Sequence, residues 1–437
     1  MCIFAAENTM DMNNAFYKAR IADELLKIKL GASAAVLVQG PKWCGKTTTS
    51  EQIASSVLYM ADPDTIKRNL LLAETDIKSL LEGNSPRLID EWQEAPQLWD
   101  AVRFAADHNH TMGQFILTGS AVPKNPNVMR HSGTGRISRL TMRPMSLWES
   151  GESKGNVSLK ELFSAPEVLF AEAELKLFDI AYLICRGGWP SASNLEIPYS
   201  LEAANDYFEA VTNTDISRVD NTLRDASKAK RLMRSLARHQ GSQVANTVIR
   251  DDMKTNDADT LTEDTVASYI SALKKIFVIE DMEAWNPNLR SKSAIRTSNT
   301  RYFTDPSIAV AALGIGPEDL LNDLNTMGLL FETLVVRDLR VYADALNGQV
   351  FHFRDRNGLE CDTVIHLRNG HYGLIEIKLG GENLIDAGAN SLNRLESKID
   401  LERMYAPSFK MVLTAVGNMA YRRKDGVYVV PIGCLKP

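Results

Sequence analysis

Residues suited to phosphate chemistry lie close together near the amino end of the chain. Gly40, Gly45, Lys46 and Thr47 fit the pattern G-x-x-x-x-G-K-[ST], whose backbone N–H groups surround a phosphate. Lys46 would reach the β and γ phosphates, and the Thr47 hydroxyl would help to hold Mg²⁺. The spacing predicts a nucleotide site. The residues expected to contact the nucleotide here are Gly40, Pro41, Lys42, Trp43, Cys44, Gly45, Lys46, Thr47 and Thr48.

An acidic pair follows about 40 residues later, at the end of a short apolar run. We assign Asp90 to the Mg²⁺ shell and Glu91 to the water that attacks the γ phosphate. Most Asp-Glu pairs are surface acids, and the distance from Lys46 favours the functional interpretation. Thr118, at the tip of another apolar run, could contact the γ phosphate or could lie in an ordinary turn after a core strand.

Two arginines are candidates for stabilising charge during phosphoryl transfer. Arg136 ends a glycine-containing loop, residues 131–136, and Arg139 follows shortly after. Either could act in cis or from a neighbouring subunit. The sequence does not choose between them, and Arg136 is our assignment.

A second set of charged residues lies near the carboxyl end. Two strands joined by a short turn at 368–370 would bring Asp362 next to Glu376, with Lys378 on the same face as Glu376. Glu332, on a helix upstream, could point at the same spot. Carboxylates that hold Mg²⁺, with a lysine nearby, suit phosphodiester hydrolysis. The pattern resembles the PD-(D/E)xK nuclease superfamily. The alternative is a surface hairpin with ordinary cross-strand ion pairs.

The elements that must position the first set alternate between strand and helix. We expect strands at 36–39, 85–92 and 114–120, and helices at 14–30, 48–58 and 97–108. A strand that leads into the phosphate-binding loop, with a helix after it, is the context that the motif requires. The amino-terminal region is therefore predicted to be an α/β core.

The middle of the chain has another pattern. Glycines and serines at 144–160 predict a connection, and the region to about residue 238 is mainly helical. Thr262 is expected to cap a helix that continues to residue 276. Strands at 277–279 and 301–303 would then flank a basic loop, as in a winged helix. Farther on we expect a helix at 329–346 and a strand at 349–354.

Composition limits the class of protein. The 437 residues are 44% hydrophobic and 24% charged, typical of a globular chain. No apolar run approaches the ~20 residues that cross a bilayer, and the five scattered cysteines predict free thiols in a reducing cytoplasm. A net charge of −6 offers no general attraction for nucleic acid. Two basic clusters, at 224–238 and 290–301, could still bind DNA or RNA.

The segments GPKWCGKTTT, RLIDEWQEAPQLWDAVR, FILTGSAVP, HSGTGRI and MRPMSLWESGES resemble a family of prokaryotic AAA-type ATPases with a C-terminal domain of uncharacterised function. The resemblance continues through RGGWPSA and RYFTDPSIAVAALG to DGVYVVPI. It implies an AAA-type core with a helical lid, a winged-helix module and a restriction-endonuclease-like α/β domain. The corresponding divisions would be 1–150, 151–238, 239–312 and 313–437.

Two functions fit these expectations. One is an ATP-driven enzyme that binds and cuts nucleic acid. The other is a nucleotide-dependent switch whose last domains bind a protein or DNA partner without cleaving it. Both would use ATP and Mg²⁺, and an AAA-type core could form a homo-oligomer. They differ at Asp362, Glu376 and Lys378.

Overall fold

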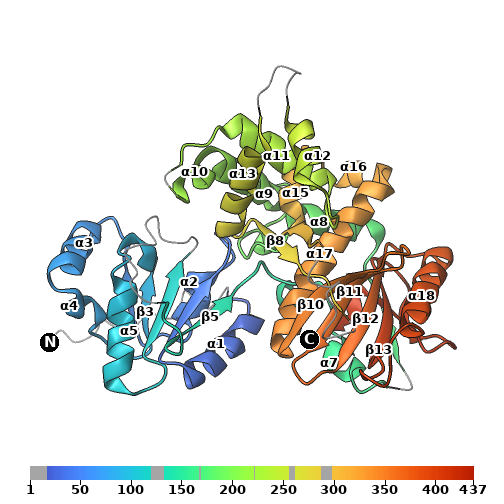
Figure 1. Ribbon diagram of the computed structural model, residues 1–437, viewed down its shortest axis with the longest axis horizontal. Coiled ribbons are helices and arrows are strands. Elements are labelled where there is room, and N and C mark those ends of the chain that lie inside the picture. The colour runs from blue at the N-terminus through green and yellow to red at the C-terminus, as the bar shows by residue number, and fades with distance from the viewer. Residues whose placement is uncertain (1–16, 120–131, 167–168, 221, 255–260, 287–297) are drawn as a thin grey trace, which may run out of the picture.

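The computed structural model has an α/β layer at the amino end, a helical region, and a second α/β layer at the carboxyl end (Figure 1). The structure describes residues 17–437 except 120–131, 167–168, 221, 255–260 and 287–297. Within this part of the chain, no helix is both long and apolar enough to span a membrane.

The first sheet is parallel throughout, with the strand order β2-β3-β4-β1-β5. Its strands are β1 (Ala35–Gln39), β2 (Ser56–Tyr59), β3 (Arg87–Asp90), β4 (Phe115–Gly119) and β5 (Ile137–Thr141). Successive side chains face opposite sides, so Val36 and Val38 pack with α1 (Ile21–Ala32), whereas Leu37 packs with α5 (Leu98–Asn109). The predicted α/β core is confirmed.

One predicted helix in this region is too long. Residues 48–58 were expected to be helical, but α2 (Lys46–Glu51) ends early, and Val57 and Leu58 belong to β2. Val57 and Leu58 are apolar neighbours, a pattern that a short strand shares with a helix. The remaining helices of the layer are α3 (Ile66–Thr75), α4 (Ile77–Leu81) and the 3₁₀ turn η1 (Trp92–Glu94).

The helical region connects the two layers. Its elements are α8 (Leu177–Arg186), η3 (Ala192–Asn194), α9 (Tyr199–Ala210), the π-helix η4 (Val211–Asp215), α10 (Ile216–Arg218), α11 (Ala226–Arg238), α12 (Asn246–Met253), α13 (Glu263–Lys275), β8 (Ile279–Met282), β9 (Thr300–Phe303), α15 (Pro306–Leu313) and α16 (Pro317–Asn322). Thr262 caps α13 by accepting the N–H of Thr265, as predicted. Helices α11 to α13 are followed by the antiparallel strands β8 and β9. The winged helix expected in this region stays a prediction.

The strand expected at 277–279 begins only at its last residue. Phe277 has a positive φ of 59° and donates its N–H to the carbonyl of Lys274, so it ends α13 instead. The basic loop expected after β8 falls on residues 287–297, which lie outside the described part of the chain.

The second sheet is mixed, with seven strands in the order β10-β11-β12-β13-β15-β14-β7. Its strands are β10 (Gly348–Arg354), β11 (Glu360–Leu367), β12 (Tyr372–Lys378), β13 (Phe409–Thr414), β14 (Met419–Arg422), β15 (Tyr428–Pro431) and β7 (Phe170–Glu172). Helix α17 (Leu324–Ala345) covers one face, and α18 (Glu382–Glu396) covers the other. Helix α17 is longer than the helix expected at 329–346, because it begins at Leu324.

Part of the division expected at 151–238 pairs with strands from the carboxyl end of the chain. Strand β7 pairs with β14, and β6 (Val157–Ser158) pairs with β16 (Leu435–Lys436). Strand β7 therefore completes the seven-stranded C-terminal sheet, and β6 forms a separate two-stranded sheet with the end of the chain. Helix α7 (Leu159–Leu162) follows β6. Two further short elements are α6 (Leu147–Ser150) and the 3₁₀ turn η5 (Ile432–Cys434). One hydrophobic core runs from Leu147 to Leu435, so the expected second, third and fourth divisions share it.

Candidate functional site: a phosphate loop and a carboxylate cluster

The loop between β1 and α2 depends on two glycines. Gly45 has a φ of 95° at the N-cap of α2, a conformation that glycine adopts without strain. A Cβ on Gly40 would lie 2.0 Å from the carbonyl oxygen of Met142, so only glycine fits there. Cys44 turns its Sγ toward the same carbonyl and is buried in the core. Gly40 and Cys44 therefore pack the loop against Met142. Because its side chain is buried, Cys44 could contact a ligand only through its backbone.

Lys46 and Thr47 hold the positions that phosphate chemistry requires. The Nζ of Lys46 donates to the carbonyl of Pro41 at 2.7 Å, which keeps the amine inside the curve of the loop. The Thr47 hydroxyl donates to Oδ1 of Asp90 at 2.7 Å. The Thr118 hydroxyl donates to the same oxygen at 2.6 Å. The parallel strands β3 and β4 thus bring Asp90 and Thr118 to the carboxyl edge of the sheet, beside the loop.

Glu91 directly follows β3 in a left-handed backbone conformation, with a φ of 54°. Gln93 donates a hydrogen bond to its carboxylate. Burial raises the pKa of Glu91, and the neighbouring charge of Asp90 raises it further. A carboxylate with a raised pKa is a better proton acceptor than an ordinary one, which suits a group that orients water.

A cavity of about 670 Å³ opens at the phosphate loop, and we call it the loop cavity. One wall comes from the predicted site: Lys42, Trp43, Gly45, Lys46, Thr47, Thr48 and Glu91. The opposite wall comes from the helical region: Pro190, Ser191, Ala203 and Asp206. Its size lies within the range of small-molecule sites.

A smaller cavity of about 230 Å³ adjoins it, and both are lined by Gly45, Thr48, Pro190 and Ser191. Tyr17 and Arg20 line the smaller cavity on the side of the first helix. Nη1 of Arg20 donates to the carbonyl of Cys44 at 2.8 Å, and its Nε pairs with Glu149 at 3.1 Å. Arg20 therefore links the backbone of the phosphate loop at Cys44 to Glu149.

Sequence reasoning missed the residues of the opposite wall. Pro190 and Ser191 belong to the segment RGGWPSA, which carries part of the family resemblance but no chemical motif. Ala203 and Asp206 lie on α9, which carries no motif. The loop is also tied to this wall, because Lys42 pairs with Asp215 at 2.7 Å. Asp215 ends a π-helix, a rare element that is frequent at functional sites, and this signal appears only in the structure.

Arg136, our candidate for stabilising charge on the phosphates, lies away from the phosphate loop of its own chain, and its action from a neighbouring subunit stays a prediction. Its carbonyl accepts the N–H of Ala35 at the start of β1, whereas the phosphate loop follows the end of β1. Five residues at about 3.3 Å each separate these edges. The side chain of Arg136 pairs instead with Asp107. Arg139 lies within β5 and donates to Gln39 at 3.4 Å, toward the loop edge.

The C-terminal hairpin brings the second predicted set together. We call Glu332, Asp362, Glu376 and Lys378 the carboxylate cluster. Lys378 lies between two acids, with Nζ 3.1 Å from Asp362 Oδ2 and 2.7 Å from Glu376 Oε2. Asp362 also accepts the N–H of Ile377 at 2.7 Å. Burial, followed by the charge of Asp362, raises the pKa of Glu376 to about 7.

Glu332 reaches this cluster from α17. Its Oε1 accepts the hydroxyl of Tyr302 at 2.6 Å, and a Cβ on Gly241 would lie 2.6 Å from the same oxygen. Burial raises the pKa of Glu332 to about 8, and the charge of Asp362 adds to this. The helical region thus closes over one side of the cluster. Among the described residues, no three acidic, histidine or cysteine side chains are arranged to hold a metal ion.

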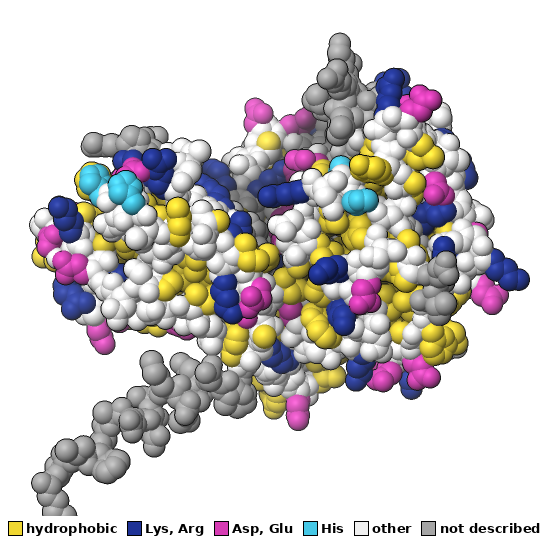
Figure 2. Space-filling view, turned by 90° about the horizontal axis from the view of Figure 1, so that it is seen from below, with side chains coloured by type: hydrophobic (Ala, Val, Ile, Leu, Met, Phe, Trp, Pro, Cys, Tyr) yellow, Lys and Arg dark blue, Asp and Glu magenta, His cyan; other side chains and the backbone are white. Residues whose placement is uncertain are grey.

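The basic cluster at 224–238 is partly neutralised by ion pairs. Arg224 pairs with Asp220, Lys230 with Glu209, and Arg238 with Asp252. Figure 2 shows the opposite side of the molecule, the underside of Figure 1, where basic and acidic side chains are interspersed. These observations do not test the expected nucleic-acid partner, which stays a prediction.

Comparison with known families divides the chain into three parts. Residues 32–150 match the AAA domain family. Residues 177–319 match a domain of unknown function (DUF8612), and residues 327–435 match another (DUF4143). The amino-terminal part is therefore an AAA-type phosphate-loop ATPase domain, which implies nucleotide binding, and two domains of unknown function follow it.

Two mycobacterial proteins, each described only as an uncharacterized protein, match most of the chain. One protein of Mycobacterium bovis and one of Mycobacterium tuberculosis are each 22% identical over 373 residues, which is 82% of this chain and 73% of theirs. A Walker-type ATPase of Pyrococcus abyssi is 16% identical, with 69% of this chain and 97% of that chain covered and a TM-score of 0.42. A RuvB variant of Thermotoga maritima is 17% identical, with 60% and 86% covered and a TM-score of 0.26.

Proposed function

We propose that this protein binds ATP in the loop cavity and hydrolyses it. The observation that carries the proposal is the meeting of Thr47 and Thr118 on one oxygen of Asp90, at the edge of a cavity lined by Lys46 and Glu91. Lys46 would bind the β and γ phosphates, and Glu91 would orient the attacking water. The wall of Pro190 and Ser191 would limit the access of bulk water.

The residues at this edge fit Mg²⁺, because a hydroxyl and a carboxylate are the oxygen ligands that this ion prefers. Thr47 and Asp90 would hold it, and Thr118 would orient the carboxylate. When bound, Mg²⁺ would neutralise charge on the phosphates. Lys46 supplies the fixed positive charge that the protein itself contributes.

A phosphate-release assay tests this proposal. Purified protein with ATP and Mg²⁺ should release phosphate steadily, and excess EDTA should stop the release because the metal links Thr47 and Asp90 to the nucleotide. Restoring Mg²⁺ should restore the rate. Binding of labelled ATP should be measured on the same preparation. If the protein neither binds ATP nor releases phosphate, the proposal is wrong.

The carboxylate cluster favours a second activity, metal-dependent cleavage of phosphodiester bonds. The supporting observation is that Asp362 and Glu376 converge on one cation, the Lys378 ammonium, which a metal ion would have to displace. Glu376 and Asp362 would hold the metal, with Glu332 beside them. Lys378 would then orient a water or balance charge on the phosphate. The alternative is a surface that binds DNA or a protein without cleaving.

The Asp362→Asn variant separates the two. We expect the wild type to cleave plasmid or single-stranded DNA with Mn²⁺ or Mg²⁺ and ATP, and we expect the variant to cut no faster than background, because the amide is a poor metal ligand. Glu360→Gln is the matched control, since Glu360 lies on the same strand but is half-exposed and pairs with Arg354. ATP-dependent retention of DNA without cleavage would support the switch instead.

A further inference from the structure

A short buried segment, Tyr302–Ser307, lies between the loop cavity and the carboxylate cluster. It links the end of β9 to the start of α15. Tyr302, Phe303, Thr304, Asp305 and Ser307 are each at most 1% exposed. The segment lies within RYFTDPSIAVAALG, residues 301–314, and neither proposed activity uses it. We call it the bridge segment.

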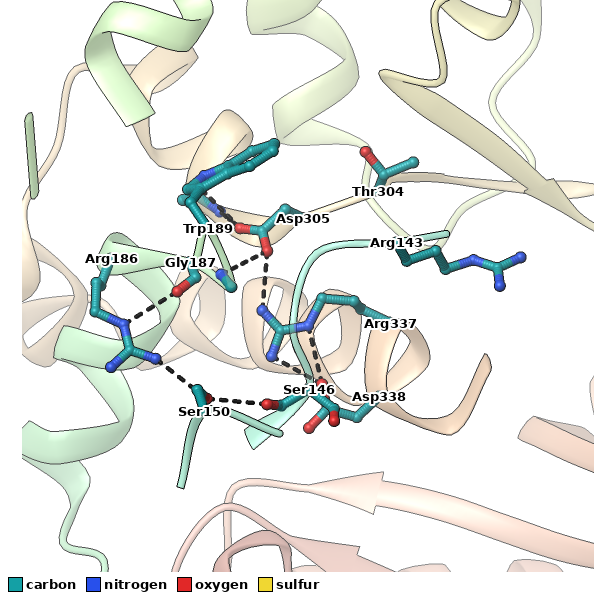
Figure 3. A network of polar contacts seen from close by, with 12 residues as sticks. Arg143, Ser146, Ser150, Arg186, Gly187, Trp189, Thr304, Asp305, Arg337 and Asp338 are labelled. Carbon is teal, nitrogen blue, oxygen red and sulfur yellow. Dashed lines mark hydrogen bonds and ion pairs between the residues drawn. The ribbon is translucent and has the colours of Figure 1, made fainter. Parts of the chain in front are cut away.

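One end of the bridge segment holds the wall of the loop cavity. Oδ2 of Asp305 accepts the N–H of Gly188 at 2.9 Å, and the hydroxyl of Ser307 accepts the indole N–H of Trp189 at 2.9 Å. Pro190 and Ser191 follow directly in the chain and line the cavity. Figure 3 shows Trp189 and the Gly187 turn lying against Asp305. Any shift of this wall toward a bound nucleotide therefore moves groups that are hydrogen-bonded to the bridge segment.

The other end contacts the carboxylate cluster. The hydroxyl of Tyr302 donates to Glu332 at 2.6 Å. Asp305 also pairs with Arg337 at 2.9 Å, and Arg337 pairs with Asp338 at 2.8 Å (Figure 3). Glu332, Arg337 and Asp338 lie on the same helix, α17. The bridge segment thus holds α17 at two points, one of them a member of the cluster.

Because the ion pairs of Asp305, Arg337 and Asp338 are buried, a displacement of one of these side chains affects the others. The side chains of Arg337, Asp305 and Asp338 are at most 1% exposed, so water cannot replace a lost partner without a large cost. Both carboxylate oxygens of Asp305 are used, since Oδ1 accepts from Ser307. Close-packed interiors transmit a displacement instead of absorbing it. A shift at Gly188 or Trp189 must therefore be followed by the bridge segment.

We propose that the bridge segment couples the two sites, so that a nucleotide in the loop cavity changes the affinity of the carboxylate cluster for its ligand through Tyr302 and Glu332. This coupling rests on the proposed nucleotide binding. Because coupling between two binding sites is reciprocal, a change at Glu332 also changes nucleotide affinity. The reciprocal effect can be measured without knowing what the cluster binds.

The test is a double-mutant cycle on the dissociation constant of a slowly hydrolysed ATP analogue with Mg²⁺. Glu332→Gln keeps the shape and an acceptor for Tyr302, and it shifts the constant by about fivefold or more, as allosteric coupling typically does. In a Tyr302→Phe background the same change has an effect of at most about twofold, the margin for independent sites. Glu360→Gln leaves the constant at the wild-type value. Thermal unfolding verifies that each variant is folded.

Hydrogen exchange of the wild-type protein gives a second measurement that needs no variant. Addition of the analogue slows exchange in the peptides that cover the bridge segment and α17, as well as in the phosphate loop. Protection confined to the loop, or equal effects of Glu332→Gln in both backgrounds, overturns the coupling. Failure of the wild type to bind the analogue at all overturns the proposed ATP site, and the coupling with it.

Discussion

The Lys46→Ala variant is expected to bind ATP far more weakly than the wild type. Lys46 is 6% exposed, and its Nζ points into the curve of the loop, where the outer phosphates would lie. Removing one partner of a buried, hydrogen-bonded charge pair costs about 2–5 kcal/mol. The dissociation constant should therefore rise between about 30-fold and several thousand-fold. Calorimetric titration of the variant with ATP and Mg²⁺ measures this change.

Lys27→Ala is the matched control for charge, because Lys27 is exposed and pairs across one helical turn with Glu24. It should bind ATP as the wild type does. ATP should also raise the melting temperature of the wild type and of the control, but not of the Lys46→Ala variant, since a ligand stabilises only the state that binds it. Unchanged affinity in the Lys46→Ala variant would show that the phosphates lie elsewhere.

The parts of the site that lie within one strand–loop–helix unit could be predicted from the sequence. The phosphate loop is recognisable from Gly40 and Gly45, the two glycines that its backbone conformation requires. The position of Asp90 follows from the apolar strand before it. Both predictions depend on neighbours in the chain. The meeting of Asp90 with Thr118 then follows from the parallel pairing of β3 and β4, whose carboxyl ends share one edge.

Features that depend on contacts between residues far apart in the chain could not be predicted from local sequence patterns. Strand β7 completes a sheet whose other strands begin about 180 residues later, and a three-residue strand has no pattern of its own. The wall formed by Pro190 and Asp206 exists only because the helical region folds back over the loop. Arg136 is a different case. Had β5 been recognised, the parallel sheet would have placed the residue before it at the opposite edge from the loop.

The C-terminal hairpin was predicted well because side chains alternate along strands. Thr363 pairs with Ile375 across β11 and β12, and the adjacent Asp362 and Glu376 both contact Lys378. The sequence could not show that Tyr302 would approach Glu332, because these residues belong to different elements. That contact joins the cluster to the helical region, and it is the reason to treat the two proposed sites as one system.

The largest effect on turnover is expected for Glu91→Gln. Glutamine has nearly the same shape and should leave the loop cavity intact, so the dissociation constant of ATP should stay close to the wild-type value. It cannot accept a proton from water, however, and loss of such a group lowers the rate by about 10²–10⁴-fold. Phosphate release under saturating ATP, measured with binding on the same samples, separates the two effects.

The structure also gives this prediction a pH dependence. Burial raises the pKa of Glu91, and only the ionised form can accept a proton. The rate should therefore fall on the acid side at a pH above the usual carboxyl range, and this limb should disappear in the Glu91→Gln variant. Glu94→Gln is the control, because Glu94 lies one turn away and is exposed. Wild-type turnover in the Glu91→Gln variant would mean that another group orients the water, and Asp206 on the opposite wall would then be the next candidate.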